Sequence, residues 1–367
     1  MVKEAARDNS EVKAGFSGLA VGDPDLVSER VALITGYTGQ DGTFLTRLLL
    51  QKGYQVIGLV RRISSEPPRR VRGNFDFSKE LSNGQLILHE GDLLSVDSLI
   101  DAVQEYEPAE IYNLGAQSHV GVSFKQPELT LEANLMGTVN LITALESVEN
   151  YIPDYNWKMY QASTSEMFGD RRSDTRLNED SPLQPVSPYA IAKAAAHSYC
   201  QMKRAQGRFI SCGILFNHES EIRGGDFVTQ KIARGVRHWQ QTGEAIALGN
   251  MESGRDWGYA GDYVEAMWLM LQQEQADDYV VATGTTHTVR AFVEEAFAAI
   301  GQEIRWSEGD RLIGYVNGQP AVVTSAEFYR PNEVGYLNGD ASKMRALGWQ
   351  PKTSFKELVK RMVEAAK

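Results

Sequence analysis

The sequence contains little cysteine and no long apolar run. Its 367 residues include only two cysteines, Cys200 and Cys212, which are too few for a disulfide framework and lack the spacing of a metal-binding motif. We therefore predict no disulfide and no bound metal. No apolar run approaches the roughly 20 residues of a membrane span, and the first residues, MVKEAARDNSEVKAG, lack the apolar core of a secretory signal. These absences lead us to expect a cytoplasmic protein with no membrane partner.

Positive charge is scarce as well. The 37 lysines and arginines are outnumbered by 48 aspartates and glutamates, which gives a net charge of -11. Such a balance argues against a nucleic-acid partner. The apolar content of 42% and the charged content of 23% are ordinary for a globular protein, and a chain of this length commonly folds as two lobes. Residues 1–28 are polar, and we expect them to form a poorly ordered extension without a role.

A glycine-rich turn follows the first expected strand. The apolar run Val31–Thr35 predicts a buried strand, and Thr43–Lys52 has the pattern of an amphipathic helix. Between them stands Gly36-Tyr-Thr-Gly39-Gln-Asp-Gly42, whose glycines would allow the backbone to approach a pyrophosphate at the N-terminus of the helix. A plain tight turn is the alternative. The order of strand, glycine turn and helix favours a dinucleotide site.

The end of the second expected strand indicates which dinucleotide is bound. The run Gln55–Val60 predicts that strand, and Arg61 and Arg62 follow it directly. An NAD enzyme carries an acidic residue there to hold the ribose 2′-hydroxyl, whereas arginine suits a 2′-phosphate. The sequence therefore favours NADP as the cofactor.

Two further strands and a long helix complete the first half of the chain. Leu86–His89 and Glu110–Leu114 are predicted strands, and Glu128–Glu146 is a predicted helix. Asp92 follows the first of these strands and is placed to cap an adenine amino group. His119 follows the second, and we interpret it as a structural loop residue without a catalytic role. The alternation of strands and helices predicts an α/β fold with a doubly wound parallel sheet.

The reactive groups are concentrated in residues 160–193. Tyr189 and Lys193 are four residues apart on an expected helix, so they share a face. A neighbouring ammonium stabilises a phenolate, and we expect it to lower the pKa of Tyr189, which could then accept a proton from a sugar hydroxyl. Thr164 and Glu166 follow an apolar, strand-like run, where a doubly wound sheet presents reactive groups. A Tyr-x-x-x-Lys pair alone is a weak signal, and a surface pair is the alternative.

The second half of the chain supplies basic residues. Lys231, Arg255 and Arg330 lie outside the predicted cofactor-binding half. Several cations converging on one cleft would suit a diphosphate, whereas each one alone is more often a solvated surface charge. We expect strands at Phe209–Phe216, Ala245–Leu248 and Tyr279–Ala282, and helices at Phe227–Gln240, Tyr259–Gln272, Val289–Ile300, Ser342–Leu347 and Ser354–Ala365.

Together these motifs resemble the extended short-chain dehydrogenase/reductase family that modifies nucleotide sugars, and within it the GDP-sugar 4,6-dehydratases. The similarity covers nearly the whole chain from Val31 onward. Gln40-Asp41 in the glycine turn and Asn217-His218-Glu219-Ser220 are specific to this branch. The runs that carry the resemblance are Ile34–Gly42, Glu110–Val120, Tyr160–Glu166, Gly213–Ser220, Arg255–Gly258, Asp262–Leu271 and Tyr329–Val334.

The resemblance implies an NADP-binding Rossmann domain, of residues 29–217 plus about 252–284, and a smaller C-terminal lobe, of about 218–251 plus 285–367, that binds a nucleotide sugar. It implies a GDP-sugar as substrate and a homodimer or homotetramer as assembly. The implied cofactor-binding residues are Gly36, Thr38, Gly39, Gln40, Asp41, Arg61, Asp92, Leu93, Leu114, Ala116, Ser118, Tyr189, Lys193, His218 and Arg223. The implied substrate-binding residues are Asn217, Lys231, Arg255, Arg330 and Glu333.

The resemblance also implies a reaction. Tyr189, activated by Lys193, would remove the proton from the sugar O4 while Thr164 hydrogen-bonds that oxygen. Glu166 would take the proton from C5 and then protonate the departing C6 hydroxyl. GDP-mannose is the first candidate substrate, and GDP-manno-heptose is an alternative. A GDP-4-keto-6-deoxysugar reductase or epimerase is a rival interpretation that Glu166 argues against, and a non-catalytic NADP-binding protein is another that the intact set of four residues argues against.

Overall fold

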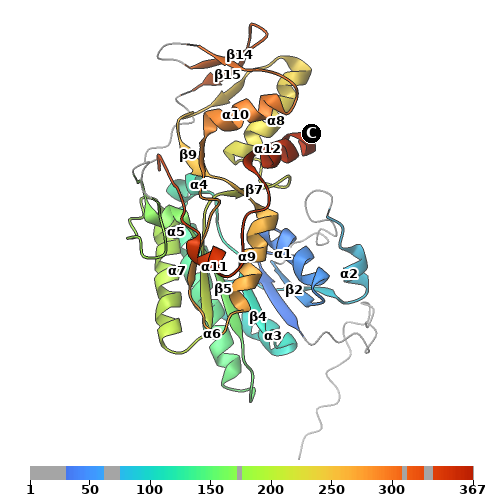
Figure 1. Cartoon of the computed structure of the whole chain (residues 1–367). Coiled ribbons are helices and arrows are strands. Elements are labelled where there is room, and N and C mark those ends of the chain that lie inside the picture. The colour runs from blue at the N-terminus through green and yellow to red at the C-terminus, as the bar shows by residue number, and fades with distance from the viewer. Residues whose placement is uncertain (1–29, 62–74, 172–175, 308–311, 326–333, 367) are drawn as a thin grey trace, which may run out of the picture.

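The computed structural model describes residues 30–61, 75–171, 176–307, 312–325 and 334–366 (Figure 1). A seven-stranded parallel sheet forms the centre of its larger part. Among the described residues, no helix has both the length and the apolar character needed to cross a membrane. The strands of this sheet are β1 (Val31–Thr35), β2 (Gln55–Val60), β3 (Leu86–Glu90), β4 (Glu110–Asn113), β5 (Lys158–Thr164), β6 (Ile210–Leu215) and β11 (Asp278–Val281).

The strands lie in the order β3-β2-β1-β4-β5-β6-β11, so the direction of winding reverses between β1 and β4. All neighbouring strands are parallel. Successive residues of β1 are buried on opposite faces, with Leu33 in one core and Ile34 in the other, as a sheet covered on both sides requires. The predicted doubly wound parallel sheet is confirmed, and its crevice is expected at the carboxyl ends of β1 and β4.

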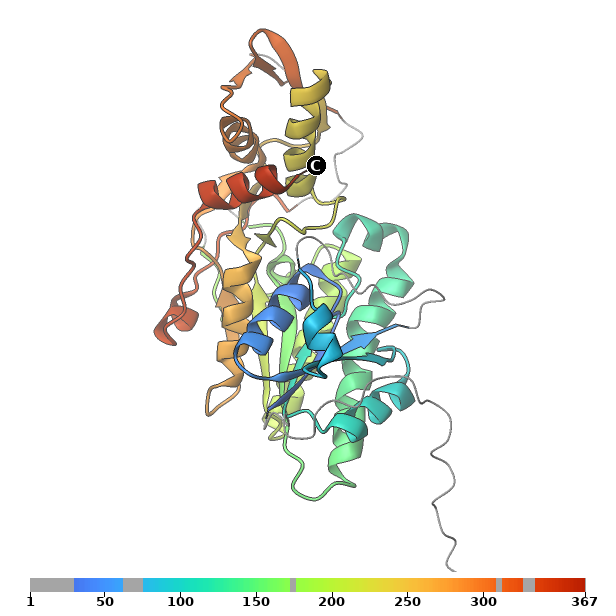
Figure 2. The same ribbon diagram turned by 90° about the vertical axis from the view of Figure 1, so that its right-hand side faces the viewer.

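Helices cover both faces of the sheet (Figures 1 and 2). On one face, α1 (Gln40–Gln51) packs against α9 (Ala260–Leu271). On the other face lie α3 (Val96–Tyr106), α6 (Gly137–Glu149) and α7 (Pro188–Ala205). The short helices are α2 (Ser78–Ser82), α4 (Val120–Lys125), α5 (Pro127–Leu131), the π-helical η2 (Glu132–Met136), the 3-10 helix η3 (Ser165–Phe168) and α11 (Ser342–Ala346).

Apart from the two cores on the faces of the seven-stranded sheet, another hydrophobic core lies in the part of the molecule at the top of Figure 1. Its helices are α8 (Val228–Thr242), α10 (Val289–Ala298) and α12 (Phe355–Ala365), with Phe292 and Phe297 fully buried among them. We propose this as the core of the smaller lobe, and the predicted domain boundaries stay a prediction. The four-stranded sheet beside it has the order β13 (Arg305–Trp306), β14 (Ile313–Val316), β15 (Gln319–Thr324) and β8 (Ile246–Leu248).

The structure differs from the sequence predictions in several elements. The helix predicted over 128–146 is three consecutive elements, α5, η2 and α6, because a π-helical turn interrupts it. His119 caps α4, where its Nδ1 accepts a 3.2 Å hydrogen bond from the backbone N–H of Val122. This is a structural contact, and the absence of a catalytic role stays a prediction. The elements that were not predicted include α2, α3, α4, β7 (His218–Glu219), β9 (Gly254–Asp256), β10 (Gly258–Tyr259), β12 (Thr286–Thr288), β13, β14 and β15.

Candidate active site

Every predicted site residue that the structure describes lines one cavity. The cavity has a volume of about 1270 Å³ and is lined by the segments that follow β1, β4, β5 and β6. This exceeds the roughly 300–1,000 Å³ of a pocket for one small ligand, so a dinucleotide and a second ligand have room. Arg330 and Glu333 lie outside the described residues. The predicted residues on the wall are Gly36, Thr38, Gly39, Gln40, Asp41, Arg61, Asp92, Leu93, Leu114, Ala116, Ser118, Thr164, Glu166, Tyr189, Lys193, Asn217, His218, Arg223, Lys231 and Arg255.

Gly36 allows the ends of two strands to meet beside the cavity. Its φ of 69° is left-handed, and a Cβ at this position would lie 2.7 Å from the backbone nitrogen of Gly115. The Thr35 hydroxyl accepts hydrogen bonds from the backbone N–H groups of Leu114 and Gly115, at 3.1 and 2.9 Å, and so holds the same approach. No side chain caps the N-terminus of α1 at Gly39. The uncapped N–H groups and the glycines fit a pyrophosphate.

The two branch-specific motifs bind each other. Gln40 Nε2 donates to the backbone oxygen of His218 at 3.1 Å, and Ser220 Oγ donates to Gln40 Oε1 at 2.7 Å. His218 Nε2 lies 2.9 Å from Asp41 Oδ2, and its Nδ1 lies 2.8 Å from the backbone oxygen of Phe216. Both of these oxygens are acceptors, so the protonated imidazolium satisfies them best. The motifs thus form one polar contact between the glycine turn and the segment after β6.

The pKa values of this pair follow from their contact. Burial alone would lower the pKa of His218 and raise that of Asp41. The charge and the hydrogen bond that each provides for the other outweigh burial, so the pKa of His218 is raised and that of Asp41 is lowered. Both residues, with Gln40, remain predicted cofactor-binding residues whose polar groups also bind one another in this structure.

The predicted catalytic side chains come together at the carboxyl end of β5. Thr164 is the last residue of β5, and its hydroxyl accepts a 3.3 Å hydrogen bond from the backbone N–H of Glu166 at the start of η3. The same threonine side chain is hydrogen-bonded to the phenol of Tyr189. Glu166 is close enough for its charge to raise the pKa of that phenol. Tyr189 and Lys193 lie on consecutive turns of α7, as predicted.

The expectation that Lys193 lowers the pKa of Tyr189 is wrong for this structure. Burial raises the pKa of Tyr189 to about 12, although the hydrogen bond from Thr164 opposes the rise. The ammonium of Lys193 donates instead to the backbone oxygen of Ala162, at 2.8 Å, and burial lowers its pKa to about 8. The four-residue spacing placed both side chains on one helix face, but the β5 carbonyl determines where the ammonium lies.

Another part of the wall is basic. Phe227 precedes α8 and offers no side-chain hydrogen bond to the helix N-terminus, and Lys231 lies in its first turn. Arg255 lies in β9, is 8% exposed, and donates to the backbone oxygen of Gly254 at 2.9 Å. Asn217 follows β6 and lines the same cavity. A helix N-terminus, an amide and two cations suit a diphosphate.

The sequence analysis missed further residues of the site. Asn134 lies in η2, and its side chain accepts from the backbone N–H of Gln117 at 2.8 Å and donates to the backbone oxygen of Gln117 at 3.0 Å. It thereby holds the loop after β4, a position where π-helical turns commonly serve function. Inside an unbroken helical pattern, nothing marked it. The missed residues that line the cavity itself include Asp226, Val228, Thr229, Leu248, Gly249, Asn250, Ser253, Trp257 and Val289.

The doubly wound sheet, the glycine turn after β1 and the Thr-Tyr-Lys set at the end of β5 define an extended short-chain dehydrogenase/reductase. The UDP-glucose 4-epimerase of Thermus thermophilus, solved in complex with NAD, is similar with a TM-score of 0.73 and 25% identity over 91% of this chain and 98% of that chain. The structure of RMD from Pseudomonas aeruginosa complexed with NADPH has a TM-score of 0.69 and 22% identity over 92% and 98% of the two chains, which shows the shared fold.

Sequence comparison identifies the family within this class. A family model described as GDP-mannose 4,6 dehydratase matches residues 33–362. The GDP-mannose 4,6 dehydratase of Drosophila melanogaster is 44% identical over 99% of this chain and 91% of that protein. The enzyme of the same name from Homo sapiens is 43% identical over 94% of this chain and 93% of that protein. The chain belongs to the GDP-mannose 4,6 dehydratase family.

The contact between His218 and Asp41 predicts a pH-dependent stability. The pKa of His218 is raised above its ordinary 6.5, so its contribution is complete below about pH 6.5 and is lost as the pH rises through the folded-state pKa. The pKa of Asp41 is lowered from 3.8, so its contribution is lost only in acid. We expect His218→Asn to cost about 2 kcal/mol of unfolding free energy near pH 6, and less near pH 9, by urea denaturation.

His238→Asn is the matched control, because His238 is 54% exposed and pairs with the exposed Glu244. Its cost should stay below about 0.5 kcal/mol at both pH values. An equal loss at the two pH values for His218→Asn would show that the imidazolium does not stabilise the fold.

Proposed function

We propose that the protein converts GDP-mannose to GDP-4-keto-6-deoxymannose with loss of water, as an NADP-dependent hydro-lyase. The observation that carries the proposal is one cavity in which Thr164, Glu166, Tyr189 and Lys193 adjoin a dinucleotide-type glycine turn, in a chain of the GDP-mannose 4,6 dehydratase family. The family indicates the reaction, and the four residues to which we assign the proton transfers and their positioning line the cavity.

We propose NADP as the resident cofactor. The two similar structures were solved with NAD and with NADPH, so the class uses a nicotinamide dinucleotide. Arg61 follows β2 and lines the cavity, at the position where an NAD enzyme carries a carboxylate for the ribose hydroxyls. A guanidinium there favours a 2′-phosphate.

The basic part of the wall supports a GDP-sugar as substrate. Lys231 and Arg255 would neutralise the diphosphate together with the N-terminal end of α8. The sugar, attached to the second phosphate, would then reach toward Thr164 and Tyr189. GDP-manno-heptose satisfies the same diphosphate contacts and is the alternative substrate.

Each catalytic residue has one role in the proposed reaction. Tyr189 takes the proton of O4, and Thr164 hydrogen-bonds O4 as it becomes a ketone oxygen. Glu166 removes the C5 proton, which the ketone has made acidic, and returns a proton to the C6 hydroxyl as it leaves. A bound oxidised nicotinamide would supply a positive charge and would carry the hydride from C4 to C6, and C5 would take up a proton in that last step, which balances the one that Tyr189 removed from O4. Lys193 holds the end of β5 through Ala162.

The charge around Tyr189 explains how a phenol with a raised pKa can act as a base. Its pKa is about 12 because it is buried, and the nearby positive charge of Arg223 already opposes that rise. A second positive charge in the cavity acts in the same direction. A bound oxidised nicotinamide would add such a charge and would favour proton removal by Tyr189.

Glu166 separates a dehydratase from a reductase or an epimerase of the same fold. A reductase or a C4 epimerase has no elimination step and no need for a carboxylate beside Thr164. In this structure the backbone of Glu166 is bonded to the Thr164 hydroxyl, and its side chain lines the cavity. A carboxylate on the cavity wall beside Thr164 supports an elimination over a simple reduction or epimerisation.

We propose a homodimer formed through the α5, η2 and α7 surface. These three elements pack against one another. Several of their large apolar side chains are exposed, with Ile191 at 48%, Met202 at 45% and Met136 at 44%. Exposed apolar side chains on elements that pack together support an interface, and two copies of one face form the commonest closed assembly.

A cytoplasmic location is also proposed. Cys200 and Cys212 are both free and buried, as expected for a reducing compartment. Recovery of the protein in an extracytoplasmic fraction would rule it out.

The dimer predicts a clear result in light scattering. We expect the native protein to have twice the mass of one chain and the double variant Ile191→Asp/Met202→Asp to have the mass of one chain, because buried carboxylates oppose association. Tyr151→Asp is the control, since Tyr151 is 80% exposed and lies after α6, away from this face. A native monomer would contradict the proposal.

The reaction is tested by a product assay. Purified protein is incubated with GDP-mannose and catalytic NADP+, without a recycling system, and the product is identified by NMR. We expect the 4-keto-6-deoxy sugar to accumulate far beyond the amount of cofactor, with no net NADPH, and we expect NAD+ to support at least about 10-fold lower kcat/KM because Arg61 then lacks its phosphate partner. Turnover with GDP-manno-heptose and none with GDP-mannose would identify the heptose sugar as the substrate. Consumption of NADPH supplied together with a GDP-4-keto-6-deoxy sugar, in place of the dehydration, would identify a reductase.

Glu166→Gln is expected to stop the reaction after the first hydride transfer. The amide cannot take the C5 proton, so kcat should fall by at least about 100-fold. Reduced cofactor should nevertheless form in a single turnover, because Tyr189 and Thr164 remain. Its near-ultraviolet absorbance gives the measurement, and Glu221→Gln is the control for loss of a carboxylate that lies outside the cavity wall, where it accepts a hydrogen bond from Tyr259. Normal turnover by Glu166→Gln would show that Glu166 does not catalyse the elimination.

A further inference from the structure

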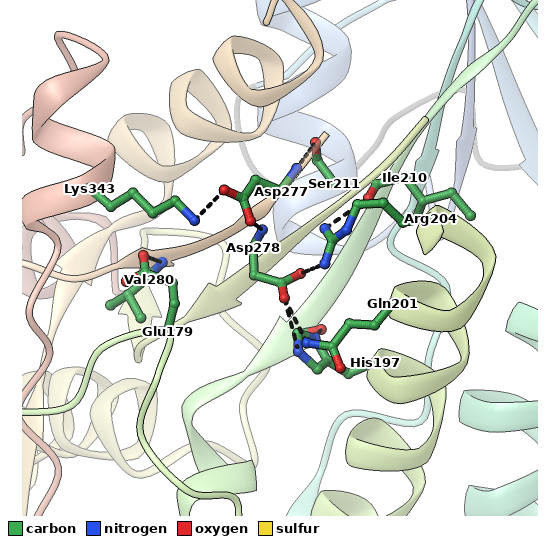
Figure 3. Close-up of polar contacts among 11 residues, drawn as sticks. Glu179, His197, Gln201, Arg204, Ile210, Ser211, Asp277, Asp278, Val280 and Lys343 are labelled. Carbon is green, nitrogen blue, oxygen red and sulfur yellow. Dashed lines mark hydrogen bonds and ion pairs between the residues drawn. The ribbon is translucent and has the colours of Figure 1, made fainter. Parts of the chain in front are cut away.

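A buried polar cluster adjoins the catalytic helix without lining the cavity. Figure 3 shows its centre, Asp278 at the start of β11, with three side chains of α7 directed toward it. Arg204 Nη2 donates to Asp278 Oδ1 at 2.7 Å, and Gln201 Nε2 donates to Oδ2 at 2.7 Å. His197 Nε2 lies 3.6 Å from the same Oδ2, and the residue is 3% exposed. The imidazole therefore lies beside a carboxylate whose two oxygens each accept a hydrogen bond from another side chain of α7.

His197 continues the catalytic face of α7. Tyr189, Lys193 and His197 are spaced by four residues and lie on three successive turns of the same face. The first two contact the end of β5, as described above. The third does so as well, because a 2.9 Å hydrogen bond joins His197 Nδ1 to Ser163 Oγ.

We propose that His197 is a positioning residue that fixes Thr164 and Glu166 through Ser163. Ser163 directly precedes Thr164 on β5, and the Thr164 hydroxyl accepts from the backbone N–H of Glu166. Any movement of Ser163 is therefore transmitted to both reacting groups. Asp278 is tied to β11 and to α7, so His197 connects the catalytic strand end to a rigid anchor. The inference rests on the proposed function, because it assigns roles to the same catalytic groups.

A metal site is the competing explanation for this cluster. The ligand atoms of His197, Cys212 and Asp278 lie within 4.8 Å of one another. Both oxygens of Asp278 are already bonded, and the guanidinium of Arg204 beside them opposes a cation. Contact with Cys200 and burial raise the pKa of the Cys212 thiol well above its usual range, which keeps it protonated. The observed bonds thus favour positioning over coordination.

The test compares two replacements of one residue. Asparagine presents its amide near the position of the imidazole Nδ1 and can keep the bond to Ser163, whereas glutamine presents it near Nε2 and cannot. Ser163→Ala removes the same bond from the other side with little change of volume. His238→Asn is the surface control. The measurements are kcat and KM for GDP-mannose in the product assay, with all variants loaded with NADP+.

We expect His197→Gln and Ser163→Ala to lower kcat by roughly 10- to 100-fold, because small displacements of reacting groups have effects of that size, with KM changed less than about twofold. His197→Asn should remain within about threefold of the native kcat, and the double variant of Ser163→Ala and His197→Gln should be no worse than either single one. Equal damage by asparagine and glutamine, multiplying losses in the double variant, or a rise in KM alone would overturn the proposal.

A second readout is independent of turnover. The chain has six histidines, so ¹⁵N-labelled imidazoles give few NMR signals. The two ring-nitrogen signals that disappear in His197→Gln belong to His197, and Ser163→Ala should shift them. A native protein that makes no product refutes the proposed function, whereas unshifted imidazole signals in Ser163→Ala refute the His197 contact. Stoichiometric zinc in the purified protein would also overturn the proposal, because His197 would then be a ligand.

Discussion

The proposed chemistry depends on the contact between α7 and the carboxyl end of β5. The helix supplies the phenol, the ammonium and the imidazole, and the strand supplies the threonine, the carbonyl and the serine that they respectively contact. The ammonium of Lys193 is buried and its pKa is lowered to about 8, so the contact places a charged group in an unfavourable environment. A fold that accepts this cost gains a fixed distance between base and substrate-binding hydroxyl.

The strand ends beside this contact are joined by one buried amide. Asn113 on β4 accepts from the Thr35 hydroxyl of β1 at 2.7 Å and donates to Gln161 Oε1 of β5 at 2.8 Å. All three side chains are almost fully buried. Because a buried polar group without a partner is costly, the three strands must keep their relative positions. The glycine turn, the loop after β4 and the end of β5, where the proposed catalytic Thr164 lies, therefore form one rigid edge.

Much of this arrangement could be predicted from the sequence, for a physical reason. Parallel strands buried on both faces are continuous apolar runs, and β2 was predicted at its observed bounds because glycines and charges end that run. Strands of two to four residues, such as β7 and β9, are too short to show a period. The π-helical turn at Asn134 leaves no mark in a helical pattern, since it adds a residue without changing composition.

Side-chain contacts across the fold were harder to predict than membership of the site. The residues that the resemblance implied, where the structure describes them, all line the cavity. The predicted effect of the Lys193 ammonium on Tyr189 was wrong, because this ammonium donates to the carbonyl of Ala162. That carbonyl lies 31 residues away in the sequence, and its position is a result of tertiary packing. The cluster at Asp278 combines residues of α7 and β11 that no short motif connects.

The bond between Gln40 and Ser220 joins residues 180 positions apart. The residues of the glycine turn and those of the segment after β6 must therefore match each other, although most strands of the parallel sheet lie between them in the sequence. A chimera that takes its first third from one relative and the remainder from another would keep every strand and helix. It would still combine two halves of a contact that were selected in different proteins, and this contact lies beside the glycine turn after β1.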